Sequence, residues 1–209
     1  MHIPKSLILI LSLCLVAICA LGCAHSPEPD TPATAADTQV SPSEDTPEAE
    51  APAPEVPTIS PEEQARYDEA AEAAFHAVDS RYQSFIGTEI VLDNSGKELQ
   101  RVSERLSELV PYYANIIKDG HSPRWSIASF YNVGTLYQHF YNSLMNTPPP
   151  EGLEEDVAQA YRELIIEYAD KFKQPAIEHY MRAVKISDSE KINTDYSENA
   201  RIRLNDLNK

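Results

Sequence analysis

The sequence predicts an all-α fold of about six helices, stacked as helical hairpins, over residues 61–209. Apolar residues recur there at three- and four-residue spacing, which is the period of a helix with one buried face. Strand-like sequence is limited to the short run 88–92. All seventeen aromatic residues also lie in this part of the chain. We therefore expect one domain that is long enough to bury a sizeable core.

The segment before this domain begins with an apolar run. Residues 7–23 read LILILSLCLVAICALGC after a short basic start, and polar, proline-rich sequence follows Cys23 at once. The run is shorter than the roughly 20 residues of a membrane-spanning helix. This layout is typical of a bacterial secretion signal that ends in a lipobox. We expect residues 1–22 to be removed and Cys23 to carry lipid, palmitate included; a spanning anchor and a cleaved signal without lipid are the alternatives.

Residues 23–60 contain the expected lipidated cysteine and an acidic, proline-rich tether. The stretch 24–60 holds eight prolines, eight acidic residues and no Lys, Arg or aromatic residue. Such a composition buries too little apolar surface to offset the entropy of ordering, so we expect disorder. Ala24, in place of Asp, favours the outer membrane over the inner one. The domain is then expected to be lipid-anchored there and to face the periplasm.

The first helix is expected over residues 61–86. Ser60 is a suitable N-cap, Pro61 suits the first helical position, and Glu63 completes a capping box. Apolar residues then repeat along one face as far as Phe85. Gly87 is expected to end this helix.

Five further helices are expected along the chain. The second begins near Lys97 and reaches Asp119, and Pro111 should kink or break it because proline removes a backbone donor. The third starts at Ser122-Pro123 and ends before the triple proline 148–150. The last three are expected at residues 153–169, 175–187 and 195–207.

Two spacings in these helices are typical of a helical repeat. The first is Phe130-x2-Val133-Gly134-x2-Tyr137, in which the small glycine would let a neighbouring helix approach closely. The second is Ala176-x3-Tyr180-x2-Ala183. These spacings resemble the tetratricopeptide repeat, a pair of antiparallel helices in a unit of about 34 residues. We expect residues 161–183 to form one degenerate repeat and residues 130–137 to be the first helix of another.

The stretch from Tyr113 to Leu207 also resembles the C-terminal region of myxobacterial tetratricopeptide proteins of gliding motility. The resemblance rests on the Gly134-x2-Tyr137 spacing, the triple proline and the final Ala200-x3-Leu204. It implies a helical interaction module without catalytic residues.

The resemblance implies that tyrosines on the repeat helices contact a partner, because tyrosine is a good interface anchor. The candidate partner-binding residues are Tyr131, Tyr137, Tyr141, Tyr168 and Tyr180, on a groove formed by the third, fourth and fifth expected helices. If Tyr180 or Trp125 belongs to the core instead, its replacement by alanine should unfold the domain. The expected partner is another envelope protein or a peptide; a self-associating spacer, and so a homo-oligomer, is an alternative.

No cofactor, metal centre or catalytic group is indicated by the sequence. Glu72 and His76 share a helix face, but a surface ion pair is the favoured interpretation, since structural zinc needs four ligands. The acidic cluster 154–156 suits the first turn of a helix; a cell-wall-acting accessory enzyme that uses these carboxylates is the remaining alternative. Residues 61–209 carry 25 acidic and 16 basic residues. This net charge argues against nucleic acid as a partner.

Overall fold

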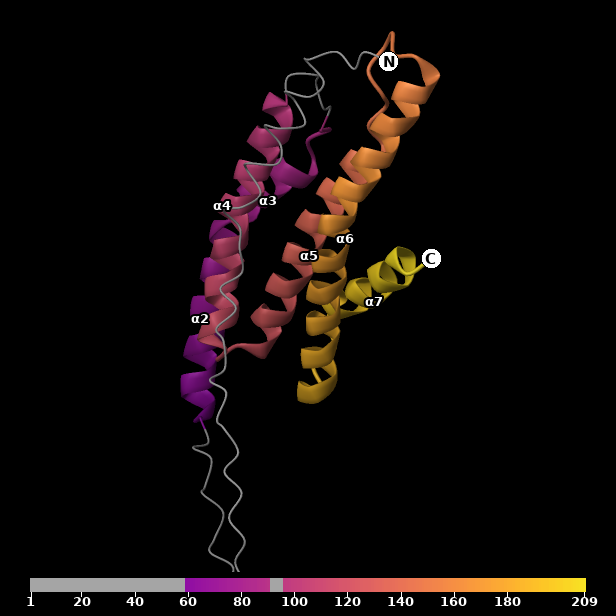
Figure 1. The fold of residues 1–209 in the computed structure, drawn as a ribbon. Helices are drawn as coiled ribbons and strands as arrows, with labels where there is room; N and C mark the ends of the chain where they lie inside the picture. Colours follow the sequence, from indigo (N-terminus) through magenta and orange to yellow (C-terminus); the bar gives the residue numbers. More distant parts are fainter. Residues whose placement is uncertain (1–58, 91–95) are drawn as a thin grey trace, which may run out of the picture. The chain divides into compact units, whose positions relative to one another are not determined.

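The computed structural model describes residues 59–90 and 96–209 (Figure 1). These residues form six helices and no strand, so the predicted all-α fold with six helices is confirmed. The helices are α2 (Pro61–Ala77), α3 (Asp79–Ile86), α4 (Lys97–Asp119), α5 (Pro123–Met145), α6 (Glu155–Glu190) and α7 (Asp195–Leu207). The expected signal 1–22, Cys23 and nearly all of the tether lie outside the described residues, as do residues 91 and 92 of the strand-like run.

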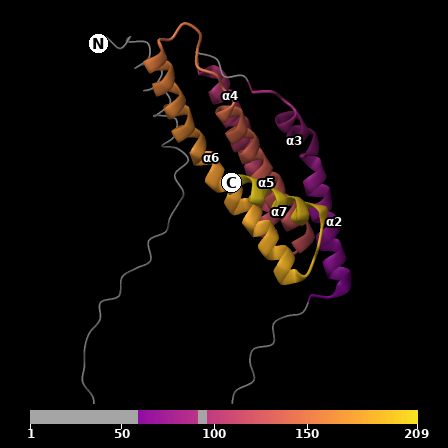
Figure 2. The ribbon, with the colours of Figure 1, turned by 90° about the vertical axis from the view of Figure 1, so that its right-hand side faces the viewer.

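Helix α5 is the central helix of the unit Ile59–Lys209. It contacts all five other described helices, and it buries 13 of its 23 residues around most of its circumference. A helix that is buried on most sides must be enclosed by several neighbours rather than lie against one of them. Figures 1 and 2 show α5 between α4 and α6, with α6 running antiparallel to it.

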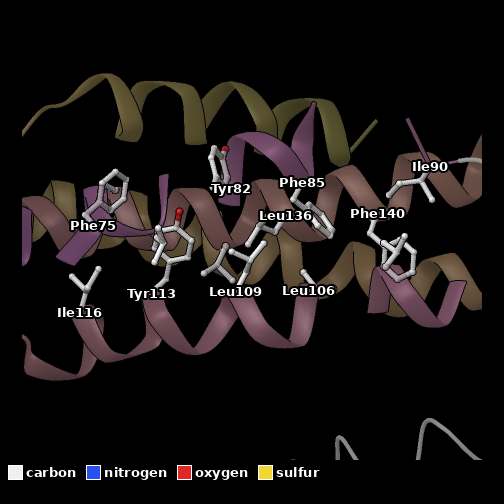
Figure 3. Close-up of a cluster of buried hydrophobic side chains, with 14 of the residues drawn as sticks. Phe75, Tyr82, Phe85, Ile90, Leu106, Leu109, Tyr113, Ile116, Leu136 and Phe140 are labelled. Atoms are coloured by element: carbon white, nitrogen blue, oxygen red, sulfur yellow. The ribbon is translucent and has the colours of Figure 1, made fainter. Parts of the chain in front are cut away.

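Two apolar clusters lie on either side of α5. The first joins α5 to α2, α3 and α4, and Figure 3 shows the large side chains that fill it. Its labelled members are Phe75, Tyr82, Phe85, Ile90, Leu106, Leu109, Tyr113, Ile116, Leu136 and Phe140. The second cluster joins α5 to α6 and α7 through Ile127, Phe130, Ala176, Tyr180, Ala183, Ala200 and Leu207. Every described helix therefore contributes apolar residues to one cluster or the other.

The predicted helix starts at Ser60 and Ser122 are confirmed. The Ser60 hydroxyl accepts from the backbone N–H of Glu63 at 3.2 Å, and Ser122 accepts from that of Trp125 at 3.5 Å. A proline follows each cap in the first turn. Gly87 ends α3 as expected.

The expected single helix over residues 61–86 is divided at Val78. Its backbone, with φ −102° and ψ −5°, separates α2 from α3. Phe75, Val78, Tyr82 and Phe85 nevertheless all lie in the first cluster. A break of one residue preserves the three- and four-residue spacing, and for that reason the spacing could not reveal it.

The expected bounds of the helix from Lys97 to Asp119 are confirmed, but it does not break at Pro111, and the helix start expected near Pro175 is wrong. Helix α4 runs without interruption through Pro111, and the helices expected at 153–169 and 175–187 are one helix, α6, with Pro175 inside it. A proline inside a helix costs about 3 kcal/mol. Burying one large apolar side chain contributes about 1.5–3 kcal/mol, and buried residues flank both prolines, among them Leu109 and Tyr113 in α4 and Tyr180 in α6. Packing on both sides therefore outweighs the local penalty.

Candidate functional site

The two repeat-like spacings meet at one close contact between α5 and α6. A Cβ atom on Gly134 would lie 2.7 Å from Cε1 and 2.8 Å from Cδ1 of Tyr180. Carbon atoms do not approach one another so closely, so only glycine lets this ring lie against the α5 backbone. The expected close approach of a helix at Gly134 is thus confirmed, and the approaching segment is 176–183.

The expected repeat over residues 161–183 is wrong. Its two halves lie on one continuous helix, α6, and so they cannot form a hairpin with each other. Instead, residues 130–137 of α5 lie opposite residues 176–183 of α6. Residues 138–175, which separate these two segments, extend both helices of this hairpin beyond the contact and form the connection between them.

Tyr180 is a core residue. Its side chain is fully buried, and its hydroxyl donates to Oε1 of Gln138 at 2.8 Å and lies 3.2 Å from Oγ1 of Thr135. Burial raises the pKa of the Tyr180 phenol well above its ordinary value, so the hydroxyl stays protonated. This ring has no exposed surface in the structure with which to contact a partner. Thr135 and Gln138, which hold it, were not among the expected site residues.

Tyr131 is half-buried between α6 and α7. Its ring centroid lies 5.8 Å from that of Tyr180 and 5.6 Å from that of Tyr196. Tyr196 in turn lies 5.8 Å from Phe75 of α2. Tyr196 is not among the residues expected at the site, although its spacing from Ala200 and Leu207 places all three on one face of α7.

Three of the expected tyrosines are half-buried along the α5–α6 hairpin. The Tyr137 ring lies 5.6 Å from the ring of His179, and Tyr141 packs against both apolar clusters. The Tyr168 ring lies 5.4 Å from that of Phe172, with Nζ of Lys171 5.6 Å from its centre. Each ring is therefore anchored on one side while part of it reaches solvent. Such a ring can contact a partner with little loss of conformational freedom.

A second pair of buried polar side chains lies in the first cluster. Nδ2 of Asn132 on α5 donates to the hydroxyl of Tyr113 on α4 at 3.1 Å. Burial raises the pKa of Tyr113, and it raises that of nearby Tyr82 to about 12. The buried tyrosine hydroxyls on both sides of α5 are thus neutral structural groups.

Two hollows on the described surface have the size of a small ligand. One, of about 360 Å³, lies between α3 and α4. Its lining residues are Ser80, Arg81, Ser84, Arg105, Glu108, Leu109 and Tyr112. The other, of about 480 Å³, lies between α6 and the C-terminal end of α7 and is lined partly by Lys173, Ile177 and Lys209. Neither hollow includes a tyrosine expected from the sequence.

The acidic and histidine side chains that the sequence singled out lie at the surface. Glu155 and Asp156 occupy the first turn of α6 and Glu154 is its N-cap. Nε2 of His76 lies 4.0 Å from Oε1 of Glu72 at the surface, as expected, and the two side chains form an ion pair when the imidazole carries a proton. Among residues 59–90 and 96–209, no three His, Cys, Asp or Glu side chains lie close enough together to hold a metal ion.

Within the described part of the chain, no helix has both the length and the apolar character needed to cross a bilayer. Cys23, the expected lipidation site, lies outside this part. Comparison with known proteins adds no relative: no family model matches the chain, and neither a curated protein nor a solved structure matches it significantly.

Proposed function

We propose that this chain is a lipid-anchored protein–protein interaction module of the bacterial cell envelope, an adaptor or assembly factor held in the outer membrane through Cys23. The observation that carries the proposal is the apolar run 7–23, which ends in Ala-Leu-Gly-Cys and is followed by acidic, proline-rich sequence. That layout leaves the all-helical domain to act at a distance from the bilayer.

The surface of the α5–α6 hairpin supports a partner-binding role. Tyr137, Tyr141 and Tyr168 are each held on one side by packing against the hairpin while part of the ring stays exposed. Rings fixed in this way are suited to bind a protein segment, since little side-chain entropy is lost on binding. The Gly134–Tyr180 contact holds the two helices of this surface together.

Metabolic labelling tests the anchor. Cells that express the full chain are grown with labelled palmitate, and the parent protein is compared with Cys23→Ala. We expect label and membrane association in the parent and neither in the variant. Label that persists in Cys23→Ala, or an unlabelled parent that fractionates with membranes, would contradict the lipid anchor.

Site-specific photocross-linking in cells tests the partner surface. A photoreactive amino acid replaces Tyr141 or Tyr168, and for comparison it replaces Tyr67 on α2, which is also half-buried. We expect one or two envelope proteins to be captured from positions 141 and 168 but not from position 67. Capture of the chain itself alone would instead support a self-associating spacer. No capture from 141 and 168 in a folded, expressed protein would contradict the adaptor role.

A further inference from the structure

Half-buried apolar side chains of three helices form one strip on the described surface, here called the α4–α6 strip. Its members come from α4, α5 and α6 and pack against one or both apolar clusters; they are Val110, Ile117, Tyr137, Tyr141, Tyr168 and Phe172. No Cα atom of α4 lies within 8 Å of one of α6. The two helices therefore flank α5 without closing over it (Figure 1), and Tyr137 and Tyr141 of α5 stay partly exposed.

The helix edges that border the strip carry no acidic side chain. On α4 the edge follows positions 99, 103, 107, 110, 114 and 117, and on α6 it follows positions 157, 161, 164, 168, 171, 175, 179, 182 and 186. Residues three and four apart lie on one face of a helix, so each series is one continuous edge. None of these 15 positions holds Asp or Glu, although residues 61–209 contain 25 acidic residues. The strip is thus an acid-free surface on a strongly acidic domain.

Two cations lie against the rings of this surface. Nζ of Lys171 is 5.6 Å from the centre of the Tyr168 ring. The guanidinium carbon of Arg182 is 5.9 Å from the centre of the Phe130 ring on α5. Between positions 157 and 186, the acidic residues of α6 lie on other faces of the helix. An occupant with an apolar centre and carboxylates along its borders therefore matches both the rings and the charge of the strip.

We propose that the α4–α6 strip binds an amphipathic helix of a partner protein, whose apolar face is bordered by Asp and Glu. A helix satisfies its own backbone hydrogen bonds, whereas an extended peptide laid on these rings would leave backbone groups without partners. The α6 edge from position 157 to position 186 is about 44 Å long, which accommodates several helical turns. The inference rests on the proposed function and specifies the class of partner.

A synthetic peptide of defined chemistry tests the strip. The probe is three repeats of Glu-Leu-Ala-Glu-Leu-Leu-Glu with a fluorescein label, in which the leucines fall on one helix face. The control peptide has Lys in place of Glu. The purified full chain in nanodiscs of neutral lipid is titrated into each peptide, and empty nanodiscs give the blank. We expect the Glu peptide to bind at least about tenfold more tightly than the Lys peptide. No binding of the Glu peptide, or equal affinity for the two peptides, would overturn the proposal.

Charges added to α4 locate the bound helix. Ala114 is exposed and lies between Val110 and Ile117 on the α4 edge, whereas the exposed neighbour Asn115 lies on another face. Ala114→Lys should tighten binding of the Glu peptide about threefold or more, and Ala114→Glu should weaken it by a similar factor. The same two changes at Asn115 should leave it within about twofold. Equal effects at the two positions would contradict a helix bound beside α4.

Neutralised cations test the α6 border in the same way. Lys171→Gln and Arg182→Gln should each weaken binding of the Glu peptide about threefold or more. Lys173→Gln removes the same charge from the face of α6 that lines the hollow beside α7, so binding should stay within about twofold. Equal weakening by Lys171→Gln and Lys173→Gln would place the peptide elsewhere and overturn the assignment.

A second copy of the chain is the competing occupant, and sedimentation of the full chain in a neutral detergent tests it. We expect no dimer that depends on the strip. A dimer that Ala114→Glu dissociates and Asn115→Glu does not would assign the strip to a second copy, against the proposal. Peptide binding by the purified chain requires neither the lipid anchor nor capture of a partner in cells. Failure of this inference is therefore distinguishable from failure of the proposed function.

Discussion

Gly134 and Tyr180 form a close contact between α5 and α6, and a single added methyl group tests it. Gly134→Ala places a Cβ 2.7 Å from the Tyr180 ring, which is fully buried and held by Gln138. Overpacking of this kind costs about 1–3 kcal/mol. The better helix propensity of alanine offsets at most about 1 kcal/mol of this loss in the free energy of unfolding. We therefore expect a net loss in the free energy of unfolding, measured by urea denaturation.

The comparison that isolates this contact uses a smaller residue at position 180. In a Tyr180→Leu background the added methyl group meets no aromatic ring, so Gly134→Ala should become neutral or stabilising. A stabilising Gly134→Ala in the parent protein would contradict the contact.

The hydrogen bond from the Tyr180 hydroxyl to Gln138 can be tested by removing a single oxygen atom. Tyr180→Phe removes the donor to Gln138 and leaves a buried amide oxygen without that partner. We expect a loss of about 1–2 kcal/mol in the free energy of unfolding. Tyr131→Phe on the same cluster should change it by less than about 0.5 kcal/mol, because the Tyr131 ring is half-buried and packs through its faces. Equal effects of the two changes would show that the hydroxyl bond contributes little.

Helix α4 continues through a proline on its exposed face. Pro111 is exposed and lies between the buried residues Leu109 and Tyr113. Pro111→Ala restores the backbone donor to Ser107 and relieves the clash in the preceding turn, so we expect the free energy of unfolding to rise by about 1–3 kcal/mol. Thermal and urea unfolding both report it. A lower stability would mean that the packing of α4 on α5 depends on the geometry that proline imposes.

Element boundaries show what the sequence could and could not predict. Starts were predictable, because Ser60 and Ser122 combine a cap with a following proline and both effects are local. The prolines at 111 and 175 suggested interruptions of the helices that do not occur. The local free-energy cost of each proline is smaller than the free energy gained when neighbouring turns bury their apolar side chains in the folded domain. The division between α2 and α3 at Val78 leaves the spacing of the apolar residues unchanged, so the periodicity of the sequence does not reveal it.

The candidate site was predictable in part for similar reasons. Gly134 and Tyr180 stood out because a small residue and a large ring at repeat spacing imply a close helix contact, although the pairing was assigned to the wrong segments. The α3–α4 hollow gave no signal, since Arg81 and Arg105 lie 24 positions apart and only the packing of two helices brings them together. The spacing of residues along a sequence indicates proximity on one helix far more readily than proximity between helices.

For the domain as a whole, buried tyrosines predict a loss of stability at alkaline pH. Burial raises the pKa of Tyr82 from 10.0 to about 12 and also raises those of Tyr113, Tyr180 and Tyr196. A raised pKa in the folded state means that the unfolded chain releases these protons first. Their contribution to stability is complete below about pH 9 and is lost as the pH rises through 10 towards 12.

Urea unfolding across this range measures the effect, with tyrosinate absorbance as a second signal. Tyr82→Phe should make the alkaline decline shallower, whereas Tyr67→Phe, which alters a half-buried tyrosine of α2, should not. A free energy of unfolding that stays constant to about pH 11 would contradict the burial of these hydroxyls.

The contact between the Tyr180 ring and Gly134 also limits how far α6 can slide along α5. A shift of one helical turn, about 5.4 Å, would bring the ring against Phe130 or Gln138, both of which carry side chains in the way. The alignment of the two arms is thus set at the middle of α5 and not by residues 146–154 at the tip. Additional sequence can be accommodated at that tip, whether through natural insertion or as a fluorescent or affinity tag, without moving the helices out of alignment.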